Sequence, residues 1–196
     1  MLNFSVIGVV LTPLYFLFLF INIKKKKTIF EHLIFTTFYI YISLVIKVTL
    51  FQIPIDNNLI NNLLSMNSGY SLNLIPFNSM FNFYSEGGKQ FWIQVGGNIL
   101  MFFPLGSYIP LITKKISSFG KMLTVIICAS LMIEITQRII SLLIKYNYRA
   151  VDIDDIILNT IGGLIGFVFY KLVISPLLIN SSLLMNKKKL PTTNSI

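Results

Sequence analysis

The chain has 196 residues, of which 55% are apolar and 12% are charged, and its mean hydropathy is +0.76. A soluble domain of this length needs more charge to cover its surface, so the composition excludes an ordinary soluble protein and indicates a membrane protein. The formal net charge of +9 could indicate nucleic-acid binding, but the positions of the basic residues argue against it.

The basic residues gather beside the ends of apolar segments. Eleven of the 16 Lys and Arg residues lie in four places: Lys24 to Lys27, then Lys114, Lys115 and Lys121, then Lys171, then Lys187 to Lys189. Clusters of this kind mark the cytoplasmic side of a membrane protein. We therefore expect all four clusters to be cytoplasmic, and we expect no nucleic-acid partner.

In chain order, about five apolar segments can cross a hydrocarbon core about 30 Å thick at a rise of about 1.5 Å per residue. The predicted fold is an all-α, polytopic transmembrane bundle in the cell membrane, with the N-terminus outside and the C-terminus cytoplasmic. The absence of a basic residue before Asn22 favours a permanent first helix over a cleavable signal. The predicted spans are residues 4–23, 29–50, 91–112, 119–144 and 155–173.

Two other segments are not predicted to cross. Residues 51–90 are rich in Asn, Ser, Gly and Pro, which predicts an external loop with room for a short interfacial helix. Residues 174–185 are apolar but contain Pro176 and Asn180, so they either extend the last helix or lie along the inner surface. We expect residues 1–50 to form two helices, residues 70–175 to contain three, and residues 176–196 to form a cytoplasmic tail.

Neither the cysteine nor the histidine content suggests catalysis. Cys128 is the single cysteine and lies in an apolar run, which predicts a packing role. His32 is the single histidine, so no histidine-rich metal site can form, and the sequence shows no convincing Ser-His-Asp or Cys-His constellation. No cofactor is expected.

Polar residues within the apolar segments are the strongest functional candidates, because each is costly in a membrane. Asn98 and Asn159 are predicted to lie roughly 10 Å and roughly 6 Å below the outer edge. Glu134, on a helix that ascends, lies about 10 Å below the same edge. Three predicted helices thus offer polar groups at similar depth.

The spacing of these residues predicts two polar helix faces. Asp152, Asp155, Asn159 and Gly162 follow at helical offsets, and Glu134, Gln137, Arg138 and Ser141 share a face of the fourth predicted helix. Because polar groups that face lipid are unfavourable, we expect the two faces to meet.

Structural roles are open for the same residues. Asp152, Asp154 and Asp155 could be helix caps, which is the favoured interpretation for Asp154 alone. Glu134 and Arg138 are spaced for an ion pair, while Asn98 and Gln137 could join helices by hydrogen bonds. Close helix packing is favoured for Gly162 and Gly166, and Pro104 with Gly106 could mark a kink.

Four ordered motifs resemble the VanZ-like family of integral membrane proteins. NILMFFPLG (residues 98–106) resembles its N-x-x-x-F-x-P-x-G motif, EITQ (134–137) its E-x-x-Q motif, and RAVDIDDIILNTIGG (149–163) its R-x-x-D-x-x-D-x-x-x-N-x-x-G motif. NLIPF (73–77) is similar to a segment that precedes them. The matched positions are Asn98, Phe102, Pro104, Gly106, Glu134, Gln137, Arg149, Asp152, Asp155, Asn159 and Gly162.

The resemblance implies a cell-envelope protein of the kind associated with resistance to the glycopeptide teicoplanin and related lipoglycopeptides in Gram-positive bacteria. The polar matched residues are expected to form a recess at the outer leaflet that engages membrane lipids, a cell-wall lipid precursor or a lipoglycopeptide without catalysis. The recess candidates are Asn98, Glu134, Gln137, Arg149, Asp152, Asp155 and Asn159.

Two other functions stay open at this stage. Glu134, Asp152 and Asp155 could bind Mg²⁺ in an enzyme that acts on a polyprenyl phosphate or another envelope lipid. A small transporter or proton relay would use the same Glu134. The absence of a visible internal repeat gives a transporter little support.

Overall fold

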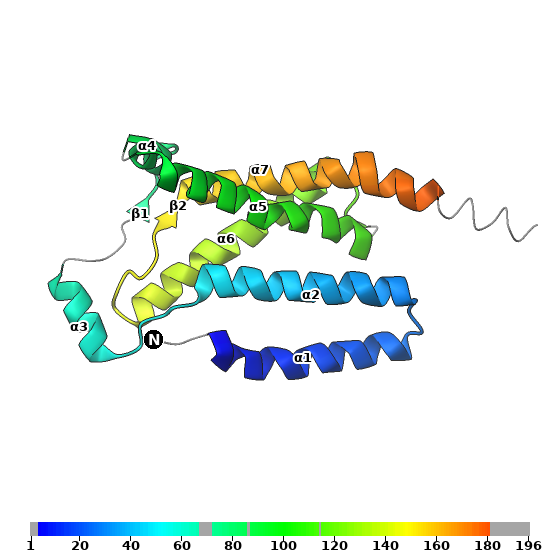
Figure 1. The fold of residues 1–196 in the computed structure, drawn as a ribbon, viewed down its shortest axis with the longest axis horizontal. Coiled ribbons are helices and arrows are strands. Elements are labelled where there is room, and N and C mark those ends of the chain that lie inside the picture. Colours follow the sequence, from blue (N-terminus) through cyan, green and yellow to red (C-terminus); the bar gives the residue numbers. More distant parts are fainter. Residues whose placement is uncertain (1–3, 67–71, 86, 114, 181–196) are drawn as a thin grey trace, which may run out of the picture.

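The computed structural model describes residues 4–66, 72–85, 87–113 and 115–180. Most of them are helical (Figure 1). The elements in chain order are α1 (Phe4–Lys24), α2 (Ile29–Leu50), α3 (Asn57–Ser65), β1 (Leu72–Asn73), α4 (Asn78–Ser85), α5 (Lys89–Ile112), α6 (Phe119–Leu143), β2 (Val151–Asp152), α7 (Ile153–Phe169) and the π-helical turn η1 (Tyr170–Ile174).

The predicted all-α membrane bundle is confirmed. Helices α2, α5 and α6, and the continuous helix over Ile153–Asn180, are long and apolar enough to cross a membrane, while α1 contributes a shorter apolar stretch at Leu11–Lys24. The helix that starts at α7 continues through η1 and Pro176 to Asn180, so residues 174–180 extend the last helix. The remainder of the predicted tail lies outside the described residues.

Local sequence explains where the helices begin. Thr28 and Glu31 form a capping box at the start of α2, in which each side chain binds the other residue's backbone N–H. Asp152 is the N-cap of α7 and accepts from the Asp154 N–H at 2.9 Å. Both caps pair with helix amides that have no partner inside the helix.

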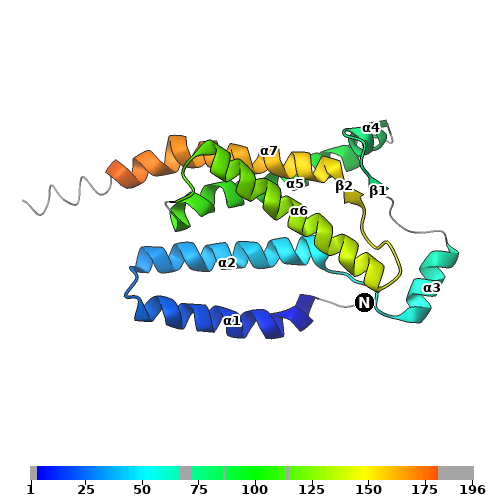
Figure 2. The ribbon, with the colours of Figure 1, turned by 180° about the vertical axis from the view of Figure 1, so that it is seen from behind.

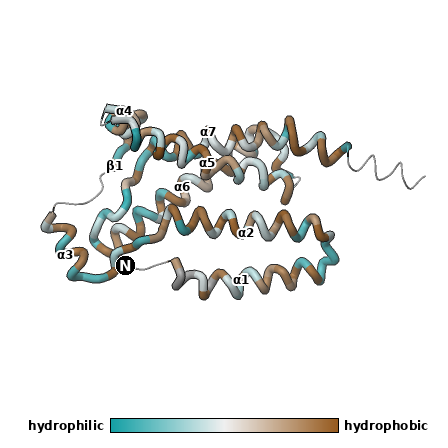
Figure 3. Tube along the Cα trace, in the orientation of Figure 1, coloured by the Kyte–Doolittle hydropathy of each residue, from teal (hydrophilic) through white to brown (hydrophobic). Residues whose placement is uncertain are grey.

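Helices α5 and α7 run side by side, α6 crosses them, and the α1–α2 hairpin lies along the bundle (Figures 1 and 2). The connections α1–α2 and α5–α6, which carry Lys25 to Lys27 and Lys115, lie at one end of the molecule. The short elements α3, α4, β1 and β2 lie at the opposite end, which we call the strand end. Hydrophobic residues dominate the lengths of the long helices (Figure 3). The placement of the strand end outside the cell stays a prediction.

Glycines bring α5 and α7 together. A Cβ atom at Gly106 would overlap the carbonyl of Gly163, and one at Gly162 would overlap backbone atoms of Ile99. Gly166 lies equally close to the carbonyl of Phe103. Around this contact is the main apolar core, which consists of Phe102, Leu105, Met122, Ile126 and Phe167. Close packing of two backbones is therefore what these glycines provide.

The segment predicted as an external loop contains ordered structure. Asp56 accepts hydrogen bonds from the Asn58 and Leu59 amides and thereby caps α3. β1 pairs with β2 in parallel, with Leu72 opposite Val151 and Asn73 opposite Asp152. This pairing, which the sequence pattern did not predict, joins the segment to the start of α7.

Candidate functional site

Asp152 is the centre of a buried polar network at the strand end. Its Oδ1 accepts hydrogen bonds from Asn73 Nδ2 at 2.8 Å and from the Asp154 N–H at 2.9 Å. Its own N–H donates to Glu134 Oε2 at 3.1 Å. Asp152 and Glu134 are 3% and 4% exposed. The network therefore joins β1, β2 and α6, and it brings together two of the predicted site residues.

Asp154 does not cap its own helix, which corrects the favoured sequence interpretation. Its carboxylate accepts hydrogen bonds from the backbone N–H groups of Phe77 and Met80, at the first turn of α4. The side chain is 1% exposed. Asp154 thus caps a helix that lies more than 70 positions earlier, with sequence separations of 77 and 74. Capping is its role, but the partner is α4 rather than α7.

Asp155 meets two side-chain amides of α5. Gln94 Nε2 and Asn98 Nδ2 both donate to Asp155 Oδ1, each at 2.6 Å. We call Asp155, Gln94 and Asn98 the carboxylate–amide cluster. All three side chains are half-buried. In the described part of the chain both hydrogen bonds to Asp155 end on Oδ1, so Oδ2 can accept from an added partner.

Gln137 and Arg149 lie elsewhere, against the last turn of α2. Gln137 Nε2 donates to the Thr49 carbonyl at 2.9 Å. Arg149 Nη2 donates to the carbonyls of Val48 at 3.0 Å and Phe51 at 3.3 Å. Arg149 therefore binds the end of α2 and does not cap α7. The last carbonyls of α2 lack partners within the helix and attract donors, particularly a cation.

Tyr148 completes this group by donating from its hydroxyl to the Leu50 carbonyl at 3.3 Å. Gln137, Tyr148 and Arg149 together form what we call the α2-end cluster. Tyr148 is 6% exposed, and burial raises the pKa of its phenol, with the charge of Arg149 acting in the opposite direction. The hydroxyl is therefore kept in the neutral form that can donate.

Asn159 lies deeper in the bundle. It is 1% exposed, and its Nδ2 donates to Ser130 Oγ at 2.9 Å. Ser130, on α6, is fully buried at 0% exposure. The predicted meeting of the α6 and α7 polar faces therefore occurs here as a hydrogen bond between two side chains.

The predicted Glu134–Arg138 ion pair does not form. Arg138 Nη1 instead donates to Asn147 Oδ1 at 3.0 Å, while Glu134 accepts from the Asp152 backbone. Nor do Glu134, Asp152 and Asp155 assemble the Mg²⁺ site considered from the sequence. Across the described ranges, no three His, Cys, Asp or Glu side chains are placed to hold a metal ion. Each carboxylate is directed to different donors.

The predicted site residues therefore divide into four sets. Glu134 and Asp152 share one network, and Asn98 and Asp155 share the carboxylate–amide cluster. Gln137 and Arg149 hold α2, and Asn159 binds Ser130. The remaining motif residues support packing: Phe102 is 2% exposed in the core, Pro104 lies within continuous α5, and Gly106 and Gly162 occupy the α5–α7 contact.

Sequence reasoning missed several partners of these residues. Gln94 precedes Asn98 by one helical turn, so helical spacing could have identified it. Asn73 lies in the NLIPF motif, which the resemblance marked without giving a role. Ser130 precedes Glu134 by four positions and extends the same face of α6. Tyr148 offered no pattern, because it lies in a connection without helical periodicity.

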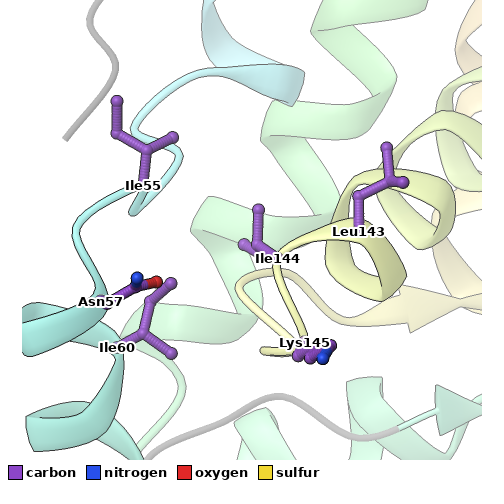
Figure 4. A pocket seen from close by; sticks show the side chains of 6 residues that line it. All are labelled: Ile55, Asn57, Ile60, Leu143, Ile144 and Lys145. Carbon is purple, nitrogen blue, oxygen red and sulfur yellow. The ribbon is translucent and has the colours of Figure 1, made fainter.

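A pocket of about 340 Å³ opens away from these polar groups, between α3 and the end of α6. Figure 4 shows its lining side chains, which come from the two sides of the gap. They are Ile55, Asn57, Ile60, Leu143, Ile144 and Lys145. None of the predicted site residues lines this pocket.

A bundle of long apolar helices that are joined at one end by buried polar groups defines a multi-pass membrane protein. The chain belongs to the VanZ/LLP1 family, whose model matches residues 38–174. It is similar to Protein VanZ of Enterococcus faecium, with 33% identity over 120 residues. That match covers 61% of this chain and 60% of the relative, so the chain spans less than two thirds of the relative's length. No solved structure matches the chain.

Proposed function

We propose that this protein is a non-enzymatic cell-envelope factor that protects against teicoplanin and related lipoglycopeptides through the carboxylate–amide cluster at the strand end. The observation that carries the proposal is the half-buried Asp155, whose Oδ1 is held by Gln94 and Asn98 at 2.6 Å. Two donors fix the position of the carboxylate, and Oδ2 can accept from an N–H or O–H group of a bound molecule.

The surrounding network supports a preorganised site. Asp152 and Asp154, which flank the start of α7, are tied to β1 and α4 by buried hydrogen bonds. Asp155 follows directly and is therefore presented from a fixed helix turn. Membrane lipids, a cell-wall lipid precursor or a lipoglycopeptide are the partners we propose, because each combines polar donors with an apolar chain.

The function is tested by measuring how susceptible a Gram-positive host that expresses the protein is to teicoplanin and to vancomycin. Teicoplanin carries an acyl chain and vancomycin does not, so a site at the leaflet should protect better against teicoplanin. Asp155→Asn keeps an oxygen that can accept from Gln94 or Asn98 but removes the charge, and protection should disappear. Asp56→Asn, which changes an exposed carboxylate that caps α3, is the matched control and should retain protection.

All variants must be compared at equal membrane abundance. Absence of protection from abundant wild-type protein would overturn the proposal, and so would full protection by Asp155→Asn. Equal protection against both antibiotics would show that the protein does not act through a site at the leaflet.

A further inference from the structure

A continuous polar stripe runs inside the bundle along α6. Ser130, Glu134, Gln137 and Ser141 follow at offsets of four, three and four, which place them on one helix face. Their exposed fractions are 0%, 4%, 7% and 2%, so the entire stripe is buried. We call these four residues the α6 polar stripe.

Buried polar atoms without partners lie on this stripe and on the helix that faces it. Among the described residues, buried side-chain atoms that lack a hydrogen-bond partner include Gln137 Oε1, Ser141 Oγ and, on the facing α7, Asn159 Oδ1. Leaving such an atom unpaired costs about 1–3 kcal/mol. Two of them on one face of α6 and a third on the facing α7 therefore indicate a ligand that supplies hydrogen bonds. Two of the three can only accept, so the ligand must be a donor.

The spacing of the stripe fits water. Residues three or four positions apart on a helix have Cβ atoms about 5–6 Å apart, so their polar atoms are close enough to be bridged by water through O–H···O bonds of about 2.8 Å. A water molecule between two neighbouring stripe residues would donate a hydrogen bond to one side chain and form a second hydrogen bond with the other. From Ser130 to Ser141 the stripe rises about 16 Å along the helix.

We infer that the α6 polar stripe and Asn159 bind a file of water molecules that enters at the strand end and reaches Ser130 in the interior. Ser141 lies at the mouth, because α6 ends at Leu143 and the exposed Lys145 follows. Glu134 lies midway, so its carboxyl group can exchange hydrogen bonds with this water. The inference rests on α6 and Asn159 rather than on the carboxylate–amide cluster, and it is independent of the proposed resistance function.

Silver-ion access to single cysteines tests the file. Ag⁺ is similar in size to water and reacts with thiols that water can reach. The wild type contains one cysteine, Cys128, which is exposed on the other side of α6 two positions from Ser130. In nanodiscs this thiol should face lipid, which makes it a control at matched depth. Ser130→Cys and Ser141→Cys are prepared in a Cys128→Ser background.

The readout is the loss of maleimide labelling after Ag⁺ treatment in chloride-free buffer and denaturation. We expect Ag⁺ to block Ser141→Cys and Ser130→Cys at least roughly tenfold faster than Cys128, a ratio that corresponds to about 1.4 kcal/mol of barrier. A Ser130→Cys thiol that reacts no faster than Cys128 overturns the inference, even if Ser141→Cys reacts.

A second experiment blocks the proposed water path along the α6 polar stripe. Ser141→Val fills the mouth with an apolar group and should slow the reaction of Ser130→Cys. Gln137→Met, which is close in size to the native side chain, tests the next position if the valine variant does not fold. The lipid-facing Ile139→Val, 51% exposed in the native chain, should have no effect. Unchanged rates in the obstructed variants would mean that water does not enter along this stripe, which also overturns the inference.

Discussion

Arg149 and Val48, separated by 101 positions, are joined by a hydrogen bond of 3.0 Å from the guanidinium Nη2 to the backbone carbonyl. The same nitrogen reaches the Phe51 carbonyl at 3.3 Å. A cation at the end of a helix complements the partial negative charge of its unpaired carbonyls. Arg149 thereby attaches the α1–α2 hairpin to the connection between α6 and α7.

Arg149→Met should loosen this attachment. The variant removes two hydrogen bonds from a charged donor, and we expect the free energy of unfolding in detergent to fall by about 1–3 kcal/mol. Arg138→Met is the matched control, because Arg138 binds only the Asn147 side chain among the described residues and should cost less. Thermal unfolding of both variants provides the comparison. Equal losses would show that the α2 carbonyls gain no particular stabilisation from Arg149.

The buried phenol of Tyr148 should make the free energy of unfolding decrease at alkaline pH. Burial raises the pKa of its phenol from the ordinary value of 10.0, so the folded state retains the proton more tightly than the unfolded state. Its contribution is fully present below the unfolded pKa and is lost as pH rises through the folded pKa. Tyr148→Phe should remove this loss and should also cost about 1 kcal/mol at neutral pH through the missing bond to Leu50.

The measurement is denaturant unfolding from about pH 8 upward, past the unfolded phenol's pKa. The wild type should lose more stability over this range than Tyr148→Phe. Tyr84→Phe, at a side chain that is 65% exposed, controls for the substitution itself and should follow the wild type. Parallel curves for wild type and Tyr148→Phe would contradict the prediction.

The Asp154 carboxylate should keep α4 folded. Asp154→Asn places a donor amide where two backbone N–H groups now meet a carboxylate, so at least one of the Phe77 and Met80 amides loses its acceptor. We expect a loss of about 2 kcal/mol and faster hydrogen exchange over residues 77–85. Asp56→Asn should instead affect α3. Unchanged exchange in α4 would show that the Asp154 carboxylate does not hold it.

The positions of the long helices could be predicted from the sequence because each is a sustained apolar run. Predicted and observed bounds differ by at most two residues for α2, α5, α6 and the start of α7. The two-residue strands β1 and β2 could not be found, because two residues have no periodicity and their partners lie far apart in the chain. The contact between Asp154 and α4 could not be predicted either, because its partners also lie far apart in the chain.

Sequence reasoning identified residues that make buried or half-buried polar contacts, but it did not identify their partners. Helical spacing placed Asp152 and Asp155 on one face, yet Asp152 is extended, with φ −130° and ψ 122°, because it caps α7. Its carboxylate therefore points to Asn73, whereas that of Asp155 points to α5. Periodicity shows which face a residue occupies within its own element, and it cannot show which other element meets that face.

The α5–α7 contact predicts a sharp contrast between glycines of the same helix. At Gly106 an added Cβ would overlap the backbone of Gly163, which cannot move aside as a flexible side chain could. Gly106→Ala should therefore separate α5 from α7 and cost about 3 kcal/mol or more, like other severe overpacking. Gly97→Ala meets nothing within 4 Å and should be neutral or stabilising by up to about 1 kcal/mol, since alanine favours helix. The two variants are compared by their yield and their thermal unfolding in detergent. Gly162→Ala, which changes the opposite helix, should destabilise the protein in the same way as Gly106→Ala. If Gly106→Ala unfolds at the temperature of Gly97→Ala, the two backbones are not in the close contact that brings Asp155 to Gln94 and Asn98.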